Sequence, residues 1–203
     1  HGAGVRFTAT PHTIDRIIGL IQLTPEAIST EALSLHADEH PVTLTAQVRY
    51  GAVPHLIATA LFDQGKIVLN ARVTPQDLVI DEGQLSLAQS HVQVTGTYGR
   101  VEHRPSALRL EGIVELAELA HLPFFPLPAL NAWGMTGLAA VTAQFQGHGS
   151  EWPAAIVRGR VRAEHLTVRG IPVEQLLCEM EQERRVLRVL IPSARFAEGK
   201  LLA

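Results

Sequence analysis

Histidine and acidic residues lie close together at positions 36–40, where they could bind a metal ion. In an extended segment His36, Asp38 and His40 would point to one side, which is a spacing that metal ligands use. The same residues precede Pro41 and a strongly alternating segment, and Asp-Glu-His-Pro is also an ordinary solvated turn. We expect the turn, and no bound metal.

Motifs for nucleophilic or phosphate chemistry are incomplete. In Gly147-His148-Gly149-Ser150 the serine follows the glycines, whereas a nucleophile elbow places it between them. The segment Gly96-Thr97-Tyr98-Gly99 lacks the helix that a phosphate-binding loop needs. Glu111 and Glu115 could form a carboxylate pair on one strand face, but the adjacent Arg109 favours surface charge pairing. We therefore expect no enzymatic activity and no cofactor.

Charge and cysteine content exclude further classes. The chain has 17 basic and 20 acidic residues, which argues against a nucleic-acid partner. Cys178 is the only cysteine, so an internal disulfide and a cysteine-rich zinc site are both excluded. Arg158, Arg160 and Arg162 form a basic stripe that could contact phosphate head groups or simply face solvent.

Alternation of apolar and polar residues dominates the sequence and predicts β-strands. Val42, Leu44, Ala46 and Val48 alternate with polar residues, as a half-buried strand requires. Turn signals such as Asp63-Gln64-Gly65 leave only short connections, which favour antiparallel pairing. We expect an all-β fold with few short helices and about a dozen antiparallel strands. The clearest strands are 42–50, 91–98, 108–116, 141–146 and 157–164, and weaker ones fit 5–9, 56–62, 66–73, 84–89, 175–181, 186–191 and 194–198.

Four other segments interrupt this pattern. Isoleucines at helical spacing predict a short helix over 14–22, although a buried strand would also suit β-branched residues. Segment 116–122 could also be helical, but its pattern is ambiguous. Segment 122–128 contains three prolines and cannot form a central strand, so we expect an apolar loop. The sequence Asp81-Glu82-Gly83 predicts a turn.

Glycines recur at a fixed interval. Gly51, Gly99 and Gly147 are 48 residues apart (99−51 and 147−99), and each follows an alternating strand and precedes a proline. This recurrence predicts approximate repeat units 42–91, 92–138 and 139–203, after a strand and short helix within 1–41. We expect residues 1–203 to form a single β-sheet segment of a longer protein.

Such a sheet has one aliphatic face, which will not be left to water, because burying one Leu or Val side chain contributes about 1.5–3 kcal/mol. The face must contact a second sheet, close on itself around a small ligand, or contact lipid. Few helical segments are available to cover it.

Short motifs in 131–203 are similar to those of a known family. A glycine-introduced strand is followed by a strand with a central glycine, then a strand ending in glycine, and finally a small-residue ending. The quoted segments are 131–138, Phe145-Gln146-Gly147, Trp152-Pro153, 156–161, 166–173, Leu187-Arg188-Val189 and 196–201. They resemble the C-terminal region of the AsmA-like family of bacterial proteins, of the TamB and YhdP type, and 42–116 has a similar texture.

This resemblance implies a long, curved, taco-like antiparallel sheet with an open groove and a hydrophobic inner face. It also implies a periplasmic segment of a protein anchored to the inner membrane outside this chain, which carries phospholipid between inner and outer membrane. The expected partners are phospholipid acyl chains and inner- and outer-membrane proteins. An assembly scaffold for outer-membrane biogenesis that acts through sheet edges, without conducting lipid, is the alternative. From the alternation we expect the groove to be lined by Leu44, Val48, Val92, Val94, Leu108, Leu110, Val141, Phe145, Val157 and Val161.

Overall fold

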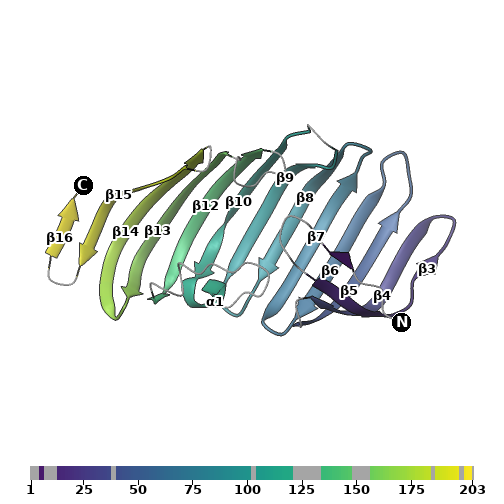
Figure 1. Cartoon of the computed structure of the whole chain (residues 1–203), viewed down its shortest axis with the longest axis horizontal. Helices are drawn as coiled ribbons and strands as arrows, with labels where there is room; N and C mark the ends of the chain where they lie inside the picture. The colour runs from purple at the N-terminus through teal and green to yellow at the C-terminus, as the bar shows by residue number, and fades with distance from the viewer. Residues whose placement is uncertain are drawn as a thin grey trace.

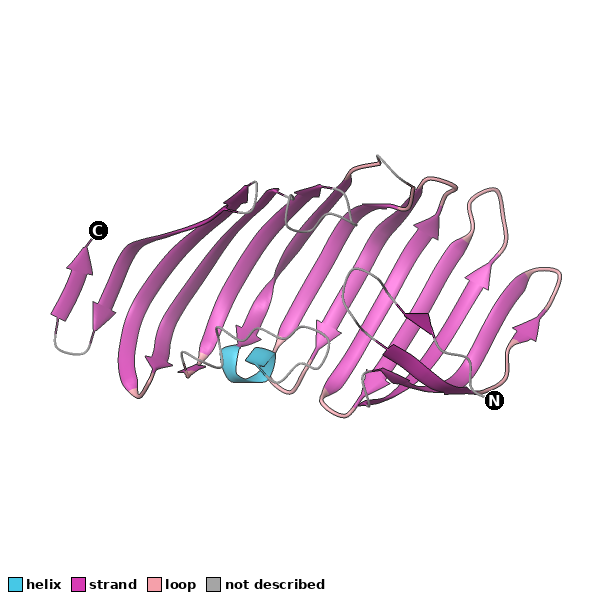
Figure 2. Cartoon of the chain, viewed as in Figure 1, coloured by secondary structure: helices cyan, strands magenta, loops and turns pink. Residues whose placement is uncertain are grey.

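A computed structural model describes residues 5–6, 13–37, 40–101, 104–120, 134–147, 156–183, 186–196 and 199–202. These residues form one long antiparallel β-sheet with a single short helix (Figures 1 and 2). The prediction of an all-β fold is therefore confirmed. The strands are β1 (Val5–Arg6), β2 (Thr13–Ile18), β3 (Gln22–Leu23), β4 (Ala27–Ala37), β5 (His40–Arg49), β6 (His55–Phe62), β7 (Gly65–Val73), β8 (Asp77–Ser86), β9 (His91–Gly99), β10 (Ser106–Glu115), β11 (Met135–Thr136), β12 (Leu138–Gly147), β13 (Ile156–Val168), β14 (Ile171–Glu183), β15 (Val186–Phe196) and β16 (Gly199–Leu202), and the helix is α1 (Leu116–Ala120).

The strands are ordered in space as they are ordered in the chain. The main path runs β1-β2-β4-β5-β6-β7-β8-β9-β10-β12-β13-β14-β15-β16, with β3 on β4 and β11 on β13. The two ends of this path lie far apart, and the described strands at the ends do not pair with each other (Figure 1). The sheet is open, so the alternative of a sheet closed on itself is wrong.

The predicted helix over 14–22 is wrong. Thr13–Ile18 instead form strand β2, which pairs with β4 through Ile14↔Ala37 and Ile18↔Ser34. The helical spacing of the isoleucines was misleading because a register shift between Asp15 and Ile18 breaks the two-residue period. The β-branched side chains suit a strand better than a helix. The ambiguous segment after β10 is helical over Leu116–Ala120, and the proline-rich segment that follows lies outside the described residues.

Two more differences arise from β-bulges. The predicted turn at Asp81-Glu82-Gly83 is instead an irregularity inside the continuous strand β8, with a register shift between Ile80 and Gly83. Strand β4 was not predicted, and its register with β5 shifts between Thr30 and Leu33. A bulge inserts an extra residue, which disrupts the alternation from which a strand is recognised.

The recurring glycines lie at the ends of three strands, on the same side of the sheet. Gly99 ends β9, Gly147 ends β12 and Gly51 follows the end of β5. These three strands run in the same direction, because an even number of antiparallel steps separates them. The two intervals differ in content, since β6, β7 and β8 fill the first and the described elements of the second are β10, α1 and β11.

The best-buried apolar cluster extends over strands β9 to β15 and includes Leu116 of α1. It contains Val92, Val114, Leu116, Ala139, Ala163, Leu166, Val173 and Ala194.

Hydrogen bonds fix α1 at this position. The Glu118 carboxylate accepts them from the Gln89 N–H (2.8 Å), the Ser90 N–H (3.0 Å) and the Ser90 hydroxyl (2.7 Å). The Ser90 oxygen in turn accepts the Glu115 N–H at 2.9 Å. The first turn of α1 is thereby attached to the β8–β9 connection.

Candidate functional site

All ten residues predicted for the groove lie on one face of the sheet. Directly paired residues of neighbouring antiparallel strands share a face, so the register traces rows across the sheet. The first row is Leu44, Ala60, Ile67, Leu85, Val92, Gly112, Val141, Val161 and Cys178. The second row is Ala46, Ala58, Leu69, Gly83, Val94, Leu110, Ala143, Gly159 and Met180. The third row is Val48, Leu56, Ala71, Ile80, Gly96, Leu108, Phe145, Val157 and Gln182.

These three rows, called the apolar face below, contain one polar side chain, Gln182, among their members. They cross nine neighbouring strands from β5 to β14. At about 4.8 Å between neighbouring strands, the rows extend for roughly 40 Å. The sequence prediction named about a third of the row members and missed those on β6, β7 and β8, where bulges and shorter alternating runs obscure the period.

Exposure differs between the two faces in the central strands. Over β9, β10, β12 and β13, every member of the three rows is buried or half-buried, while the residues between them are exposed. Val92 is 5% exposed and Phe145 8% exposed, whereas their neighbours Gln93 and Gln144 are exposed. The apolar face is thus the less solvent-accessible face in this part of the sheet.

The opposite face of the same strands carries paired charges. Arg158 contacts Glu181 at 3.0 Å, Arg160 contacts Glu179 at 2.7 Å, and Arg109 contacts Glu111 at 3.0 Å. A shallow depression of about 820 Å³ over this face is lined by several of these residues. Two residues of the predicted basic stripe, Arg158 and Arg160, are matched by glutamates of the neighbouring strand, which favours a solvated face over phosphate binding at these two positions. The third, Arg162, lies opposite Leu177.

The residues considered for metal or acid–base chemistry are not assembled. His36 pairs with Pro41 and Ala37 with His40, so His36 and His40 lie on opposite faces of the β4–β5 hairpin; Asp38 lies outside the described residues. In the described ranges, no three His, Cys, Asp or Glu residues gather where they could hold a metal ion.

The two glutamates of β10 have separate partners. Glu111 contacts Arg109, while the Glu115 carboxylate accepts hydrogen bonds from the Gly137 N–H at 2.7 Å and the Ala117 N–H at 3.4 Å. Most of Gly147-His148-Gly149-Ser150 lies outside the described residues.

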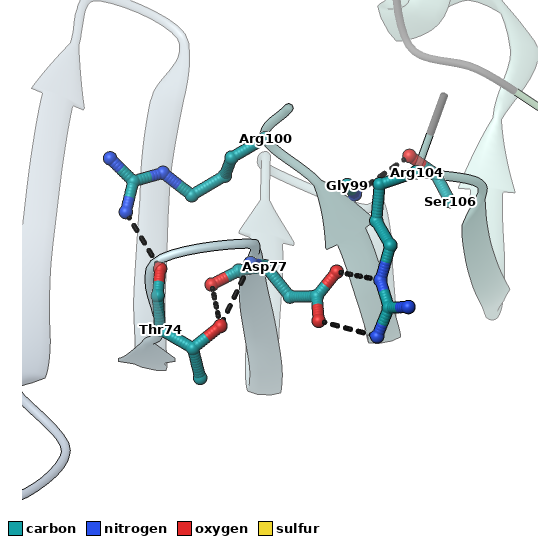
Figure 3. Close-up of polar contacts among 6 residues, drawn as sticks. All are labelled: Thr74, Asp77, Gly99, Arg100, Arg104 and Ser106. Atoms are coloured by element: carbon teal, nitrogen blue, oxygen red, sulfur yellow. Dashed lines mark hydrogen bonds and ion pairs between the residues drawn. The ribbon is translucent and has the colours of Figure 1, made fainter. Parts of the chain in front are cut away.

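A polar network lies at the strand ends where the β7–β8 turn meets the β9–β10 connection (Figure 3). It was not predicted from the sequence. Two hydrogen bonds of 3.0 and 3.1 Å join the Asp77 carboxylate to the Arg104 guanidinium, and the pKa of Arg104 is raised by this bond and by the charge of Asp77. The Thr74 hydroxyl accepts the Asp77 N–H at 2.8 Å, and Arg100 donates to the Thr74 carbonyl at 3.0 Å.

The neighbouring serine completes this network. The Ser106 hydroxyl, in a side chain only 1% exposed, accepts the Gly99 N–H at 3.0 Å. A Cβ at position 99 would collide with the Arg104 carbonyl oxygen, so this position requires glycine. The network contains no nucleophile with a neighbouring base, and it joins two connections of the sheet. We assign it a structural role.

Comparisons with protein families, with curated proteins and with solved structures give no match for this chain. In the described part of the chain, no helix has the length and apolar character needed to cross a membrane.

Proposed function

We propose that this chain is a periplasmic segment of an AsmA-like protein whose apolar face binds phospholipid acyl chains during transport between inner and outer membrane. The observation that carries the proposal is the continuity of the three apolar rows across nine strands. The periplasmic location, the inner-membrane anchor outside this chain, and inner- and outer-membrane proteins as partners belong to the proposal through the sequence resemblance.

The dimensions of the apolar face suit this ligand. Its length of roughly 40 Å exceeds the hydrocarbon core of a bilayer, which is about 30 Å thick and holds two leaflets of acyl chains. An acyl chain therefore fits along the rows with length to spare. Each CH₂ group removed from water contributes about 0.8 kcal/mol, so a chain can be held without a specific polar contact.

An open sheet also suits transport. A lipid whose chains lie against the apolar face keeps its charged head group in water at the open side, and no polar group has to be desolvated. The apolar rows contain no charged side chain that would stop a chain from sliding along them.

Photocrosslinking tests the proposal directly. A photoreactive amino acid at Val94 or Leu110, incorporated in the folded chain and mixed with phospholipid vesicles, should crosslink to lipid, whereas the same group at Thr95 or Arg109 on the opposite face should not. Mass spectrometry of the purified chain should also detect co-purified phospholipid. Equal crosslinking from both faces, or none from either, would contradict acyl-chain binding.

The second candidate function is a scaffold that acts through the sheet edges. It is favoured by the N-terminal edge, where Ile18 is 70% exposed, Leu20 69% and Leu23 74%. Exposed aliphatic residues in and beside a strand can contact an extended segment of another protein. A scaffold without lipid conduction would bind client segments while giving no lipid crosslinks from Val94.

A further inference from the structure

The two long sides of the apolar face differ in exposure over β5 to β9. On the side where α1 lies, the residues two positions beyond the first row are buried, since Val42 and Leu87 are each 7% exposed and Ser90 0%. On the other side, two positions beyond the third row, Tyr50 is 47% exposed and Tyr98 39%. Residues two apart along an extended chain share a face, so both tyrosines continue the apolar face. This exposed side, which ends in the β5–β6, β7–β8 and β9–β10 connections, is called the tyrosine side below.

A short sequence recurs on the tyrosine side. Tyr50-Gly51-Ala52-Val53 and Tyr98-Gly99-Arg100-Val101 are 48 residues apart (98−50), which is the interval between the recurring glycines. Val53 is 48% exposed and Val101 47%, so each of these connections presents a tyrosine and a valine to solvent. A tyrosine has an apolar ring and a polar hydroxyl, and it therefore suits the boundary between acyl chains and water.

The Arg100 side chain extends from the β9–β10 connection to the β7–β8 turn (Figure 3). Its guanidinium donates to the Thr74 carbonyl at 3.0 Å. Thr74 directly follows Val73, and the register Val73↔Leu78↔Tyr98 puts Val73 in the same row as Tyr98. The positive charge of Arg100 therefore lies at the outer end of the tyrosine side.

Among the described residues, no carboxylate forms an ion pair with Arg100. The other arginines near these connections are matched, Arg104 by Asp77 and Arg72 by Asp81. Because two hydrogen bonds of 3.0 and 3.1 Å hold Asp77 to Arg104, Asp77 does not compete for Arg100. A guanidinium has five N–H donors, so Arg100 keeps donors for an anion after its bond to Thr74.

We propose that the tyrosine side holds the head group of a bound phospholipid, with the phosphate beside Tyr98 and hydrogen-bonded to Arg100. This inference rests on the proposed function and adds to it the side at which the head group leaves the apolar face. Charge complementarity selects the ligand, because a phosphate is anionic and arginine binds it through parallel N–H···O bonds. Tyr98 is two residues, or roughly 7 Å, beyond the third row, so acyl chains attached to this phosphate begin at the rows.

A photoreactive head group tests the side. Phosphatidylethanolamine with a diazirine on its amine is incorporated in phosphatidylcholine vesicles and mixed with the folded chain. Tyr98 and Ser90 are eight residues apart, roughly 27 Å along the strand direction, which exceeds the reach of the probe. Mass spectrometry should therefore find head-group crosslinks at residues 98–101, and not at residues 85–90 on the side of α1.

Substitution of Arg100 tests the phosphate contact. Arg100→Gln removes the charge but keeps an amide donor for Thr74, and it should weaken binding of short-chain phosphatidylcholine about threefold to fivefold. Short-chain diacylglycerol has the same chains and no phosphate, so its binding should be unchanged. Arg100→Lys restores the charge and should recover part of the loss. The matched control is Arg49→Gln, at an exposed arginine that donates to Gln47 on the opposite face, and it should bind both lipids as the wild type does.

Head-group crosslinks at residues 85–90, or equal numbers on both sides, would overturn the proposal. Equal loss of phosphatidylcholine and diacylglycerol binding in Arg100→Gln, or an equal loss in Arg49→Gln, would do the same. Inorganic phosphate that binds as tightly as short-chain phosphatidylcholine would show a site for the free anion instead. Acyl-chain binding is measured separately at Val94, because lipid crosslinks there together with head-group crosslinks at residues 85–90 would refute only the tyrosine side.

Discussion

The hydroxyl of Ser106 accepts the backbone N–H of Gly99 at 3.0 Å and joins the end of β9 to the start of β10 within a buried corner. Ser106→Ala would leave the Gly99 N–H without its partner. An unsatisfied buried donor costs about 1–3 kcal/mol, so the free energy of unfolding should fall by that amount. Urea unfolding measures it. Ser34→Ala, at an exposed serine of β4, should change stability by less than about 0.5 kcal/mol, and equal losses in both variants would contradict the assigned role.

Charge on the apolar face should reduce lipid binding. Val94→Asp places a carboxylate in the second row, where an acyl chain would have to desolvate it at a cost of several kcal/mol. Lipid crosslinking and transport should therefore decrease while the chain stays folded. Thr95→Asp, on the opposite face, is the control and should leave lipid crosslinking and transport nearly unchanged. Phe145→Arg and Gln144→Arg form a second matched pair, in which equal loss in both would show that the face is wrongly assigned.

The attachment of α1 depends on Ser90, which is fully buried. Its hydroxyl donates to Glu118 and accepts from the Glu115 N–H, so Ser90→Ala leaves the Glu115 N–H unpaired and removes one of the three hydrogen bonds that the Glu118 carboxylate accepts. We expect about 1–3 kcal/mol of destabilisation. Hydrogen exchange should accelerate most at Gln89 and Glu115 and in α1. Uniform acceleration across β5 to β8 would instead indicate a global effect.

Stability should depend on pH through Asp81. Its pKa is lowered chiefly by the hydrogen bond from Arg72, which approaches at 2.6 Å. A carboxyl group with a lowered folded-state pKa stabilises the fold above its unfolded pKa near 4 and loses this contribution as pH falls through the folded value. The wild-type chain should thus be slightly more stable than Asp81→Asn at pH 7, and the difference should vanish once the pH falls below the lowered folded-state pKa of Asp81. A difference that persists at low pH would contradict this origin. Because the pair is exposed, high salt should also reduce it.

Cys178 should report on lipid at the apolar face. It is the partner of Val161 in the first row, and burial, with a smaller effect of Glu179, raises the pKa of its thiol. Alkylation needs the thiolate, so the folded chain should react more slowly than the unfolded chain at the same pH. Phospholipid vesicles should slow the reaction further. Protection that is equal in Val94→Asp and in wild type would show that the lipid lies elsewhere.

The sequence alone was sufficient to predict strands, and the face on which their side chains lie, where alternation ran unbroken. Strands β5, β9, β10, β12 and β13 were predicted, and the ten chosen apolar residues share one face, because a two-residue period determines the side on which each side chain lies. Bulges break this two-residue period. In β4 and β8 an extra residue inverts the alternation partway along the strand, and in β2 a register shift left isoleucines at a spacing that resembles a helix.

The long-range polar contacts could not be predicted from local sequence. Glu118 and Ser90 are 28 residues apart, and Asp77 and Arg104 are 27 apart. Their meeting depends on the lengths of the intervening strands and on the register between them. Turn composition at Asp77 or a serine before a strand carries no signal of a partner so far along the chain.

The spatial order of the strands has a consequence for how the chain acquires its structure. Along the main path each strand pairs with the strand that precedes it in the chain, apart from the steps over β3 and over α1 and β11. Such pairing closes only short loops and costs little chain entropy at each step. A chain that is synthesised N-terminus first can therefore add strands one at a time onto a sheet that is already formed. At every stage the newest strand is the edge to which the next strand is added. Insertion or loss of a whole hairpin would change the length of the apolar face without changing how any other pair of strands is made.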